Sequence, residues 1–157
     1  MTKIKEKIIQ IGLKEAQKAF LEDEVPVGAV IFNTQTGEII AKAHNKIVQS
    51  KDATAHAERL AISKACKKLK TDKLTGYSLF STLEPCVMCS GAIALSRLDK
   101  VYYGASDLKT GAIEQGAKVF THPQTHHKPK QIENLNISAC GQILTDFFKT
   151  KRKNELL

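Results

Sequence analysis

Two short segments of the chain carry the residue types of a metal-dependent hydrolytic site. One is His56-Ala57-Glu58 and the other is Pro85-Cys86-Val87-Met88-Cys89. A catalytic zinc ion takes three protein ligands and keeps a fourth position for water, whereas a structural zinc ion is enclosed by four. His56, Cys86 and Cys89 supply three ligands, so the pattern favours a catalytic zinc site.

The same chemistry needs a group that moves protons without binding the metal. Zinc lowers the pKa of a bound water to about 7. Glu58 lies two residues beyond His56, and its carboxylate is predicted to take a proton from that water, pass it to a ring nitrogen and help protonate the leaving amine. His-x-Glu together with Pro-Cys-x-x-Cys is the signature of zinc-dependent nucleobase deaminases.

Each motif alone has a less specific explanation. His-x-Glu is often a solvated helix face, and Cys-x-x-Cys also occurs in redox pairs and in half of a zinc ribbon. A ribbon needs a second cysteine pair, but Cys66 and Cys140 are too scattered to form one and are expected to be small buried residues. A redox pair leaves His56 and Glu58 without a role. Both motifs together favour a catalytic zinc that activates water.

The elements that must position these motifs follow from hydrophobic periodicity. Proline is tolerated in the first turn of a helix, so Pro85 is expected to open one. Helices are predicted over residues 3–21, 54–70, 85–96 and 140–148, and strands over residues 25–32, 38–43, 77–81 and 100–103, with a further strand or connection ending at 136–138. Residues 45–52 and 121–130 are expected to be loops. Alternating strands and helices predict an α/β class, with a central sheet covered by helices.

Length, composition and charge indicate the number of domains, the location and the kind of partner. A chain of 157 residues with 42% apolar residues suits one domain, residues 1–157. No apolar stretch approaches the roughly 20 residues of a membrane span, and no signal peptide is evident, so a cytoplasmic protein is expected. The formal net charge of +8 favours a polyanionic partner.

The sequence resembles the bacterial tRNA-specific adenosine deaminases, which fall within the cytidine-deaminase-like superfamily. Five segments carry the resemblance, which covers nearly the whole chain: residues 24–30, 52–58, 82–92, 104–112, and 146–148 with the basic run that follows. It implies a CMP/dCMP-type deaminase domain with a three-layer α/β/α fold and a five-stranded mixed sheet. It also implies one zinc ion per subunit, a homodimer, and a tRNA anticodon stem-loop as substrate, with adenosine converted to inosine at the wobble position.

Residue roles follow from the resemblance by position. His56, Cys86 and Cys89 match the zinc ligands, and Glu58 matches the proton shuttle. The other matched positions contact the substrate: Asn45 the flipped base, Val27 and Ala57 the pocket wall, Asp107 and Lys109 the anticodon nucleotides, and Phe148 and Arg152 the RNA beside the last helix. Relatives often carry an Asn-His pair where this chain has His126 and His127, and no role is assigned to these histidines.

Three hypotheses follow. The zinc centre is common to deaminases of RNA and of free guanine, cytosine or nucleosides, so it does not distinguish them. Charge and the flanking segments favour RNA, because phosphates attract lysine and arginine and unpaired anticodon bases are easily splayed out. A metabolite deaminase is the alternative. A structural zinc or redox protein is the third hypothesis, and it predicts a closed four-thiol site or a disulfide.

Overall fold

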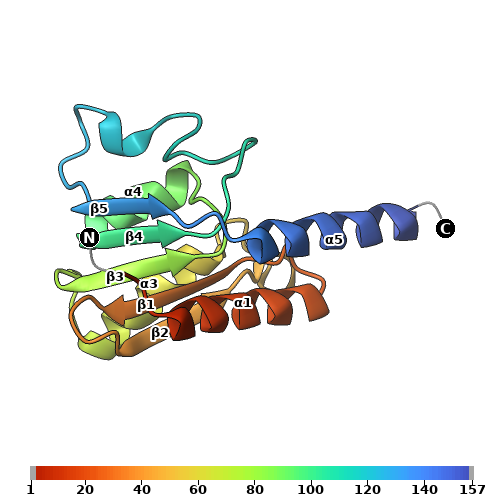
Figure 1. Cartoon of the computed structure of the whole chain (residues 1–157), viewed down its shortest axis with the longest axis horizontal. Helices are drawn as coiled ribbons and strands as arrows, with labels where there is room; N and C mark the ends of the chain where they lie inside the picture. The colour runs from red at the N-terminus through yellow and green to blue at the C-terminus, as the bar shows by residue number, and fades with distance from the viewer. Residues whose placement is uncertain (1–2, 156–157) are drawn as a thin grey trace.

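The computed structural model describes residues 3–155 and is built around a five-stranded sheet (Figure 1). The strands are β1 (Gly28–Asn33), β2 (Ile39–His44), β3 (Tyr77–Ser81), β4 (Lys100–Tyr103) and β5 (Gln131–Asn134). Their spatial order is β2-β1-β3-β4-β5. β1 runs antiparallel to β2 and β3, whereas β3, β4 and β5 are mutually parallel. The mixed sheet confirms the expected class.

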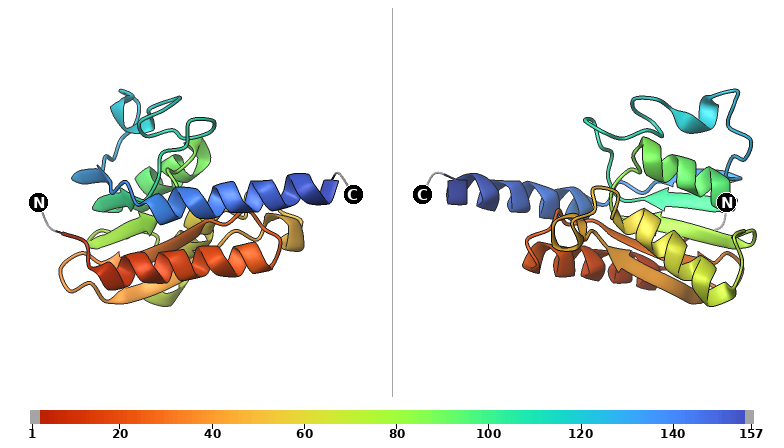
Figure 2. Two further views of the ribbon diagram at one scale, coloured as in Figure 1. Left: turned by 45° about the vertical axis from the view of Figure 1, so that its right-hand side comes forward. Right: turned by 180° about the vertical axis from the view of Figure 1, so that it is seen from behind.

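Helices cover both faces of the sheet. They are α1 (Glu6–Leu21), α2 (Ile47–Ser50), α3 (Ala57–Leu69), α4 (Val87–Ser96) and α5 (Ser138–Glu155), with a 3-10 turn at η1 (Val119–Thr121). α1 and the start of α5 lie on one face, and α3 and α4 lie on the other (Figures 1 and 2). The rest of α5 runs past the end of the sheet (Figure 2). The expected three-layer α/β/α fold is therefore confirmed.

Alternation along the strands explains how both faces are covered. Successive side chains of a strand point to opposite faces, and in β1 Ala29 and Ile31 pack with α3 and α4 while Val30 and Phe32 pack with α1. All four are buried. A sheet with apolar residues on both faces must be covered on both sides, so the unbroken apolar run of β1 dictates a layer of helices on each face.

One glycine allows α1 to approach the sheet closely. A Cβ at Gly28 would collide with the carbonyl oxygen of Gly12 and lie 2.8 Å from the backbone nitrogen of Ala16. Backbone atoms cannot rotate out of the way as a flexible side chain can. The contact therefore requires glycine at the first position of β1, directly after Val27.

Several element boundaries differ from the prediction. β1 begins at Gly28 instead of residue 25, because Val27 donates its N–H locally to the Val25 carbonyl (2.9 Å) and Pro26 has none to donate. α3 begins at Ala57 instead of residue 54, because the Asp52 side chain accepts the Thr54 N–H (2.8 Å) and holds a turn there. The expected loop over residues 45–52 contains the short helix α2.

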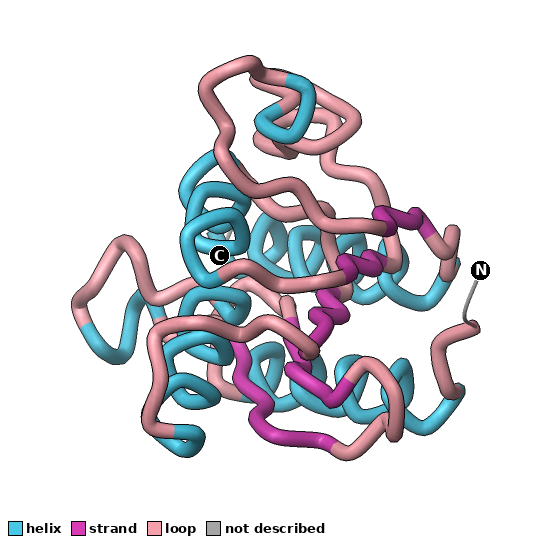
Figure 3. The backbone as a smooth tube through the Cα atoms, turned by 90° about the vertical axis from the view of Figure 1, so that its left-hand side faces the viewer, coloured by secondary structure: helices cyan, strands magenta, loops and turns pink. Residues whose placement is uncertain are grey.

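The last strand and the loop before it also differ in detail. β5 ends at Asn134, so residues 135–137 are a connection and not the end of a strand, and Ser138 already begins α5. Most of the long segment between β4 and β5 is irregular and lies at one end of the molecule, as the end-on view shows (Figure 3). Within residues 3–155, no helix combines the length and the apolar character needed to cross a membrane.

Candidate active site

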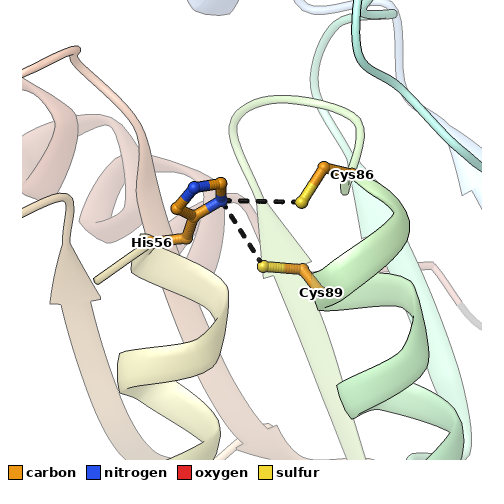
Figure 4. Close-up of side chains that lie close together, drawn as sticks. All are labelled: His56, Cys86 and Cys89. Atoms are coloured by element: carbon orange, nitrogen blue, oxygen red, sulfur yellow. Dashed lines mark hydrogen bonds between the residues drawn. The ribbon is translucent and has the colours of Figure 1, made fainter. Parts of the chain in front are cut away.

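The three predicted metal ligands meet where two helices begin (Figure 4). His56 directly precedes α3, Cys86 directly precedes α4, and Cys89 lies in the first turn of α4. The Nδ1 atom of His56 is 3.6 Å from the Cys86 sulfur and 3.7 Å from the Cys89 sulfur. All three ligand atoms lie within 4.8 Å of one another.

These distances and donor types fit zinc. Bonds of about 2.1 Å to nitrogen and about 2.3 Å to sulfur, at tetrahedral angles, separate the two donors by roughly 3.6 Å. The observed separations agree with that value. A hydrogen bond from Cys89, supported by His56, lowers the pKa of the Cys86 thiol to about 4, and zinc binds the thiolate form of cysteine. Three protein ligands leave the fourth position that a catalytic site requires.

Glu58 lies beside this site in the first turn of α3. Its side chain is buried, and burial raises the pKa of the carboxyl group to about 7. A carboxyl group with such a pKa exchanges protons readily near neutral pH. Glu58 lines the same cavity as His56 and Cys86, so its place in the structure suits a proton carrier.

The cavity has a volume of about 460 Å³, within the usual range for a small-molecule site. Besides His56, Glu58 and Cys86, its lining includes the predicted substrate-binding residues Val27, Asn45, Asp107, Lys109 and Phe148. Five residues predicted from different segments therefore meet at one pocket. Ala57 and Arg152 are not part of its lining. Ala57 is fully buried and Arg152 is exposed further along α5.

The orientation of Asn45 is fixed by the start of α3. The Ala57 N–H donates to the Asn45 Oδ1 atom at 2.7 Å. Asn45 itself is buried. Because Oδ1 accepts this bond, the amide NH₂ group of Asn45, which can donate two hydrogen bonds, is the group available to a substrate. Ala57 thus contributes to the site through its backbone, by orienting Asn45.

The loop that carries Asp107 and Lys109 is shaped by its own side chains. The Asp107 carboxylate accepts hydrogen bonds from the N–H groups of Lys109 and Thr110 and from the Thr110 hydroxyl, at 3.0, 3.0 and 2.7 Å. Leu108, at the tip of this turn, is 83% exposed at the rim of the cavity. Across the lining, Phe148 is 45% exposed and packs edge-on against Phe147. The cavity therefore has exposed apolar groups at its edge.

Sequence reasoning missed several residues of the site. Ile47, Leu83, Leu108 and Thr110 line the cavity, and Glu84 lines it while being 2% exposed. An acidic residue between Leu83 and Pro85, in an otherwise apolar stretch, was the available signal for a buried carboxylate. His127 binds the Leu98 carbonyl at 2.9 Å and His126 is exposed, away from the cavity lining.

Comparisons with known proteins agree with this geometry. Residues 2–105 match the family described as the cytidine and deoxycytidylate deaminase zinc-binding region. A tRNA-specific adenosine deaminase from Aquifex aeolicus is 45% identical over 150 residues, which are 96% of this chain and 97% of that protein. The chain belongs to the tRNA-specific adenosine deaminases of this zinc-binding family.

Two solved structures complete the comparison. One, from a study of A-to-I editing by tRNA:A34 deaminases at the wobble position of transfer RNA, has a TM-score of 0.84 and 40% identity, covering 89% of this chain and 100% of that chain. The other is a guanine deaminase from Nitrosomonas europaea with a TM-score of 0.71 and 22% identity, covering 94% and 96% of the two chains. The second likeness shows only that the fold is shared. In this family member, His56, Cys86 and Cys89 form the zinc site.

Proposed function

We propose that the protein is a zinc-dependent deaminase that converts adenosine to inosine at the wobble position of a tRNA anticodon loop. The observation that carries the proposal is the convergence of His56, Cys86, Cys89 and Glu58 on one cavity, in a chain 45% identical to a tRNA-specific adenosine deaminase. Adenosine and water give inosine and ammonia.

The chain's own groups divide the work of this reaction. His56, Cys86 and Cys89 would hold the zinc ion, which would lower the pKa of a bound water to about 7 and make it a nucleophile at neutral pH. Glu58 would accept one proton of the attacking water and deliver it to the ring nitrogen next to the attacked carbon. It would then carry the remaining proton of the added hydroxyl group to the amino group, which leaves as ammonia. The buried carboxylate suits both steps, since its pKa of about 7 lets it gain and lose protons at neutral pH.

Recognition of the base is assigned to the cavity wall. The NH₂ group of Asn45 donates to a ring acceptor of the adenine, and Val27 forms part of the apolar surface against which the base packs. Asp107 shapes the loop that presents Lys109 to the phosphates of neighbouring nucleotides. Phe148 stacks on an unpaired base, as aromatic side chains do in single-stranded RNA recognition.

Exposed charge and apolar groups support RNA over a free base. Beyond Phe148, α5 exposes Lys149, Arg152 and Lys153 on a segment that extends past the sheet. Such a row of cations suits a phosphate backbone that leads away from the pocket. A small metabolite would gain nothing from this surface, so the metabolite deaminase remains the second candidate on the strength of the shared zinc centre alone.

The deciding experiment incubates the purified protein with an anticodon stem-loop that carries adenosine at the wobble position. Free adenosine, cytidine, cytosine and guanine are tested in parallel, and Glu58→Gln is the blank. We expect inosine in the stem-loop only, with no product in the variant, which keeps its zinc. Deamination of a free base with the stem-loop unchanged would assign the protein to the metabolite deaminases.

We also propose a homodimer formed through α4. Val87 and Leu95, two turns apart on one side of this helix, are 60% and 79% exposed, and a Cβ at Gly91 between them would meet no atom within 4 Å. An apolar helix side with a central glycine suits close packing against a second copy. Sedimentation equilibrium checks this: Leu95→Glu should yield monomers, and the exposed Leu21→Glu variant should not. We further propose that residues 1–157 form one deaminase domain and that the enzyme acts in the cytoplasm, where its tRNA substrate is found.

A further inference from the structure

Two buried glutamates beside the cavity take no part in the chemistry assigned above. Glu24 and Glu84 are each only 2% exposed. Glu24 follows α1, and Glu84 lies between β3 and Cys86. Burying a carboxylate is costly unless hydrogen bonds compensate it. In both residues the compensating donors are backbone N–H groups of segments that line the cavity.

Glu84 fastens the segment after β4. Its Oε1 atom accepts the N–H of Asp107 at 3.1 Å. Its Oε2 atom accepts the N–H groups of Ile113, Glu114 and Gln115 at 3.0, 2.9 and 3.2 Å. Four amides spread over nine residues thus converge on one carboxylate, which lies two residues before a zinc ligand. The wall of the cavity and the metal site are connected through this side chain.

The loop is wrapped closely around that carboxylate. A Cβ at Gly111 would lie 2.6 Å from Glu84 Cδ and 2.5 Å from the Asp107 carbonyl oxygen. Gly111 also forms a bridge with Cys86, and Ala112 donates its N–H to the Pro85 carbonyl at 3.0 Å. The segment therefore has no room for another side chain at this point, and its path is set by the position of Glu84.

Glu24 does the same for a second segment of the wall. Its two oxygens accept the N–H groups of Val48 and Gln49, each at 2.9 Å. These amides belong to the first turn of α2, beside the cavity-lining residues Asn45 and Ile47. The backbone N–H of Glu24 donates to the Ala19 carbonyl at the end of α1 (2.9 Å). Glu24 thus ties the start of α2 to the end of α1.

We propose that Glu24 and Glu84 are positioning residues that hold the two segments of the cavity wall, residues 46–50 and 107–115, in the arrangement that receives the substrate. Hydrogen bonds to a carboxylate are about twice as strong as those between neutral groups, so each carboxylate can hold its segment, one of them largely irregular and the other the four-residue helix α2. The positioning rests on hydrogen bonds of this chain, and its link to substrate binding rests on the proposed function.

Hydrogen exchange of the zinc-loaded protein tests the positioning directly. In Glu84→Gln an amide NH₂ group faces backbone donors, so we expect exchange in residues 107–115 to accelerate at least tenfold while residues 46–50 are unchanged. In Glu24→Gln we expect the reverse. Each variant is the control for the other, and the exposed Glu38→Gln should change neither segment. Zinc content should stay equal to that of the unaltered protein. Equal acceleration of both segments in either variant, or no acceleration, would overturn the proposal.

Steady-state kinetics on the stem-loop test the consequence for the substrate. A displaced wall weakens binding, so we expect KM to rise at least fivefold in each variant while kcat changes less than threefold. A fall in kcat with KM unchanged would contradict the positioning role. If the unaltered protein does not deaminate the stem-loop, the proposed function fails, and the exchange result still decides the role of the glutamates.

A third measurement serves if a variant does not fold. In the unaltered protein, the amides of Asp107, Ile113, Glu114 and Gln115 should exchange at least tenfold more slowly than in an unstructured peptide of the same sequence. Exchange at the peptide rate would show that Glu84 does not hold them, and would overturn the proposal without any substitution.

Discussion

Asn45 allows the structural and substrate-binding roles of one side chain to be separated by two substitutions. Its Oδ1 atom accepts the Ala57 N–H at 2.7 Å, and its NH₂ group is assigned to the base. Asn45→Ala removes both interactions. Asn45→Asp keeps an oxygen acceptor for Ala57 but replaces the donor by a second oxygen. Asn45→Asp should therefore be the more stable of the two variants but the less active one.

The expected magnitudes follow from burial of the bond. Leaving a buried N–H without a partner costs about 1–3 kcal/mol, and water from the adjacent cavity reduces that cost, so Asn45→Ala should lower the free energy of unfolding by about 1 kcal/mol. Asn45→Asp should be less destabilising, because an acceptor at a helix N-terminus is favourable. In activity, the loss of one neutral hydrogen bond in Asn45→Ala predicts roughly a tenfold fall in kcat/KM. An acceptor facing an acceptor in Asn45→Asp predicts a fall of about a hundredfold or more.

The assay combines urea denaturation with inosine formation in the anticodon stem-loop. Equal activity of Asn45→Asp and the unaltered protein would refute the assignment of the NH₂ group to the base. An Asn45→Asp variant less stable than Asn45→Ala would refute the role of Oδ1 as the acceptor that completes α3. Zinc content serves as the common control, because neither substitution touches a ligand.

Three further predictions follow from the structure. Gly28→Ala should destabilise the fold by about 3 kcal/mol in urea denaturation because its Cβ meets the backbone of α1. Gly141→Ala, in α5, would bring its Cβ only into ordinary van der Waals contact with the Ala105 side chain at 4.0 Å, and should stabilise the fold by about 0.5–1 kcal/mol. Equal effects of the two substitutions would contradict the close approach of α1. Burial raises the pKa of Glu15, but hydrogen bonds from Lys18 and His44 outweigh it and hold that pKa below 4.5. At pH 7 the free energy of unfolding of Glu15→Gln should therefore be about 2 kcal/mol lower than that of the unaltered protein. This difference should persist down to about pH 4.5 and shrink as the pH falls through the pKa of Glu15 in the folded protein. A difference independent of pH would refute the ionic interaction of Glu15 with Lys18 and His44. After removal of zinc by a chelator, iodoacetamide at pH 6 should label Cys86, because the hydrogen bond from Cys89 lowers the pKa of the Cys86 thiol to about 4. It should spare Cys140, because burial raises the pKa of that thiol to about 12. Peptide mass spectrometry measures the labelling of both cysteines, and preferential labelling of Cys140 would contradict the prediction.

The residues that bear chemistry could be predicted because their side-chain types are rare and their spacing is short. His56 with Glu58, and Cys86 with Cys89, each lie within one helical turn, so local structure alone brings each pair together. The helices and most strands could be predicted from periodicity, since β1, β3 and β4 bury side chains on both faces of the sheet, whereas β5 buries none of its four residues. The boundaries at Val25 and Thr54 were wrong because local hydrogen bonds compete there with the regular elements.

Glu24 and Glu84 could not be predicted by the same means. Their partners are backbone amides, which every residue except proline carries, so no residue type marks the partner positions in the sequence. The helix α2 is four residues long, too short for periodicity to reveal it, and its first amides are satisfied by Glu24 from a distant part of the chain. Such contacts depend on tertiary structure and not on local pattern.

Strand pairing explains why the metal site and the loop after β4 meet at all. β3 and β4 are parallel, and their last residues, Ser81 and Tyr103, are register partners. Chains that leave parallel neighbours emerge at the same edge of the sheet, so residues a few positions beyond each strand are close: the Glu84 N–H donates to the Ala105 carbonyl at 2.8 Å, and the Glu84 carboxylate accepts the Asp107 N–H. The contact between the zinc motif and the substrate loop is therefore a consequence of parallel pairing. An antiparallel β4 would carry Asp107 to the opposite edge and leave the zinc site without this wall.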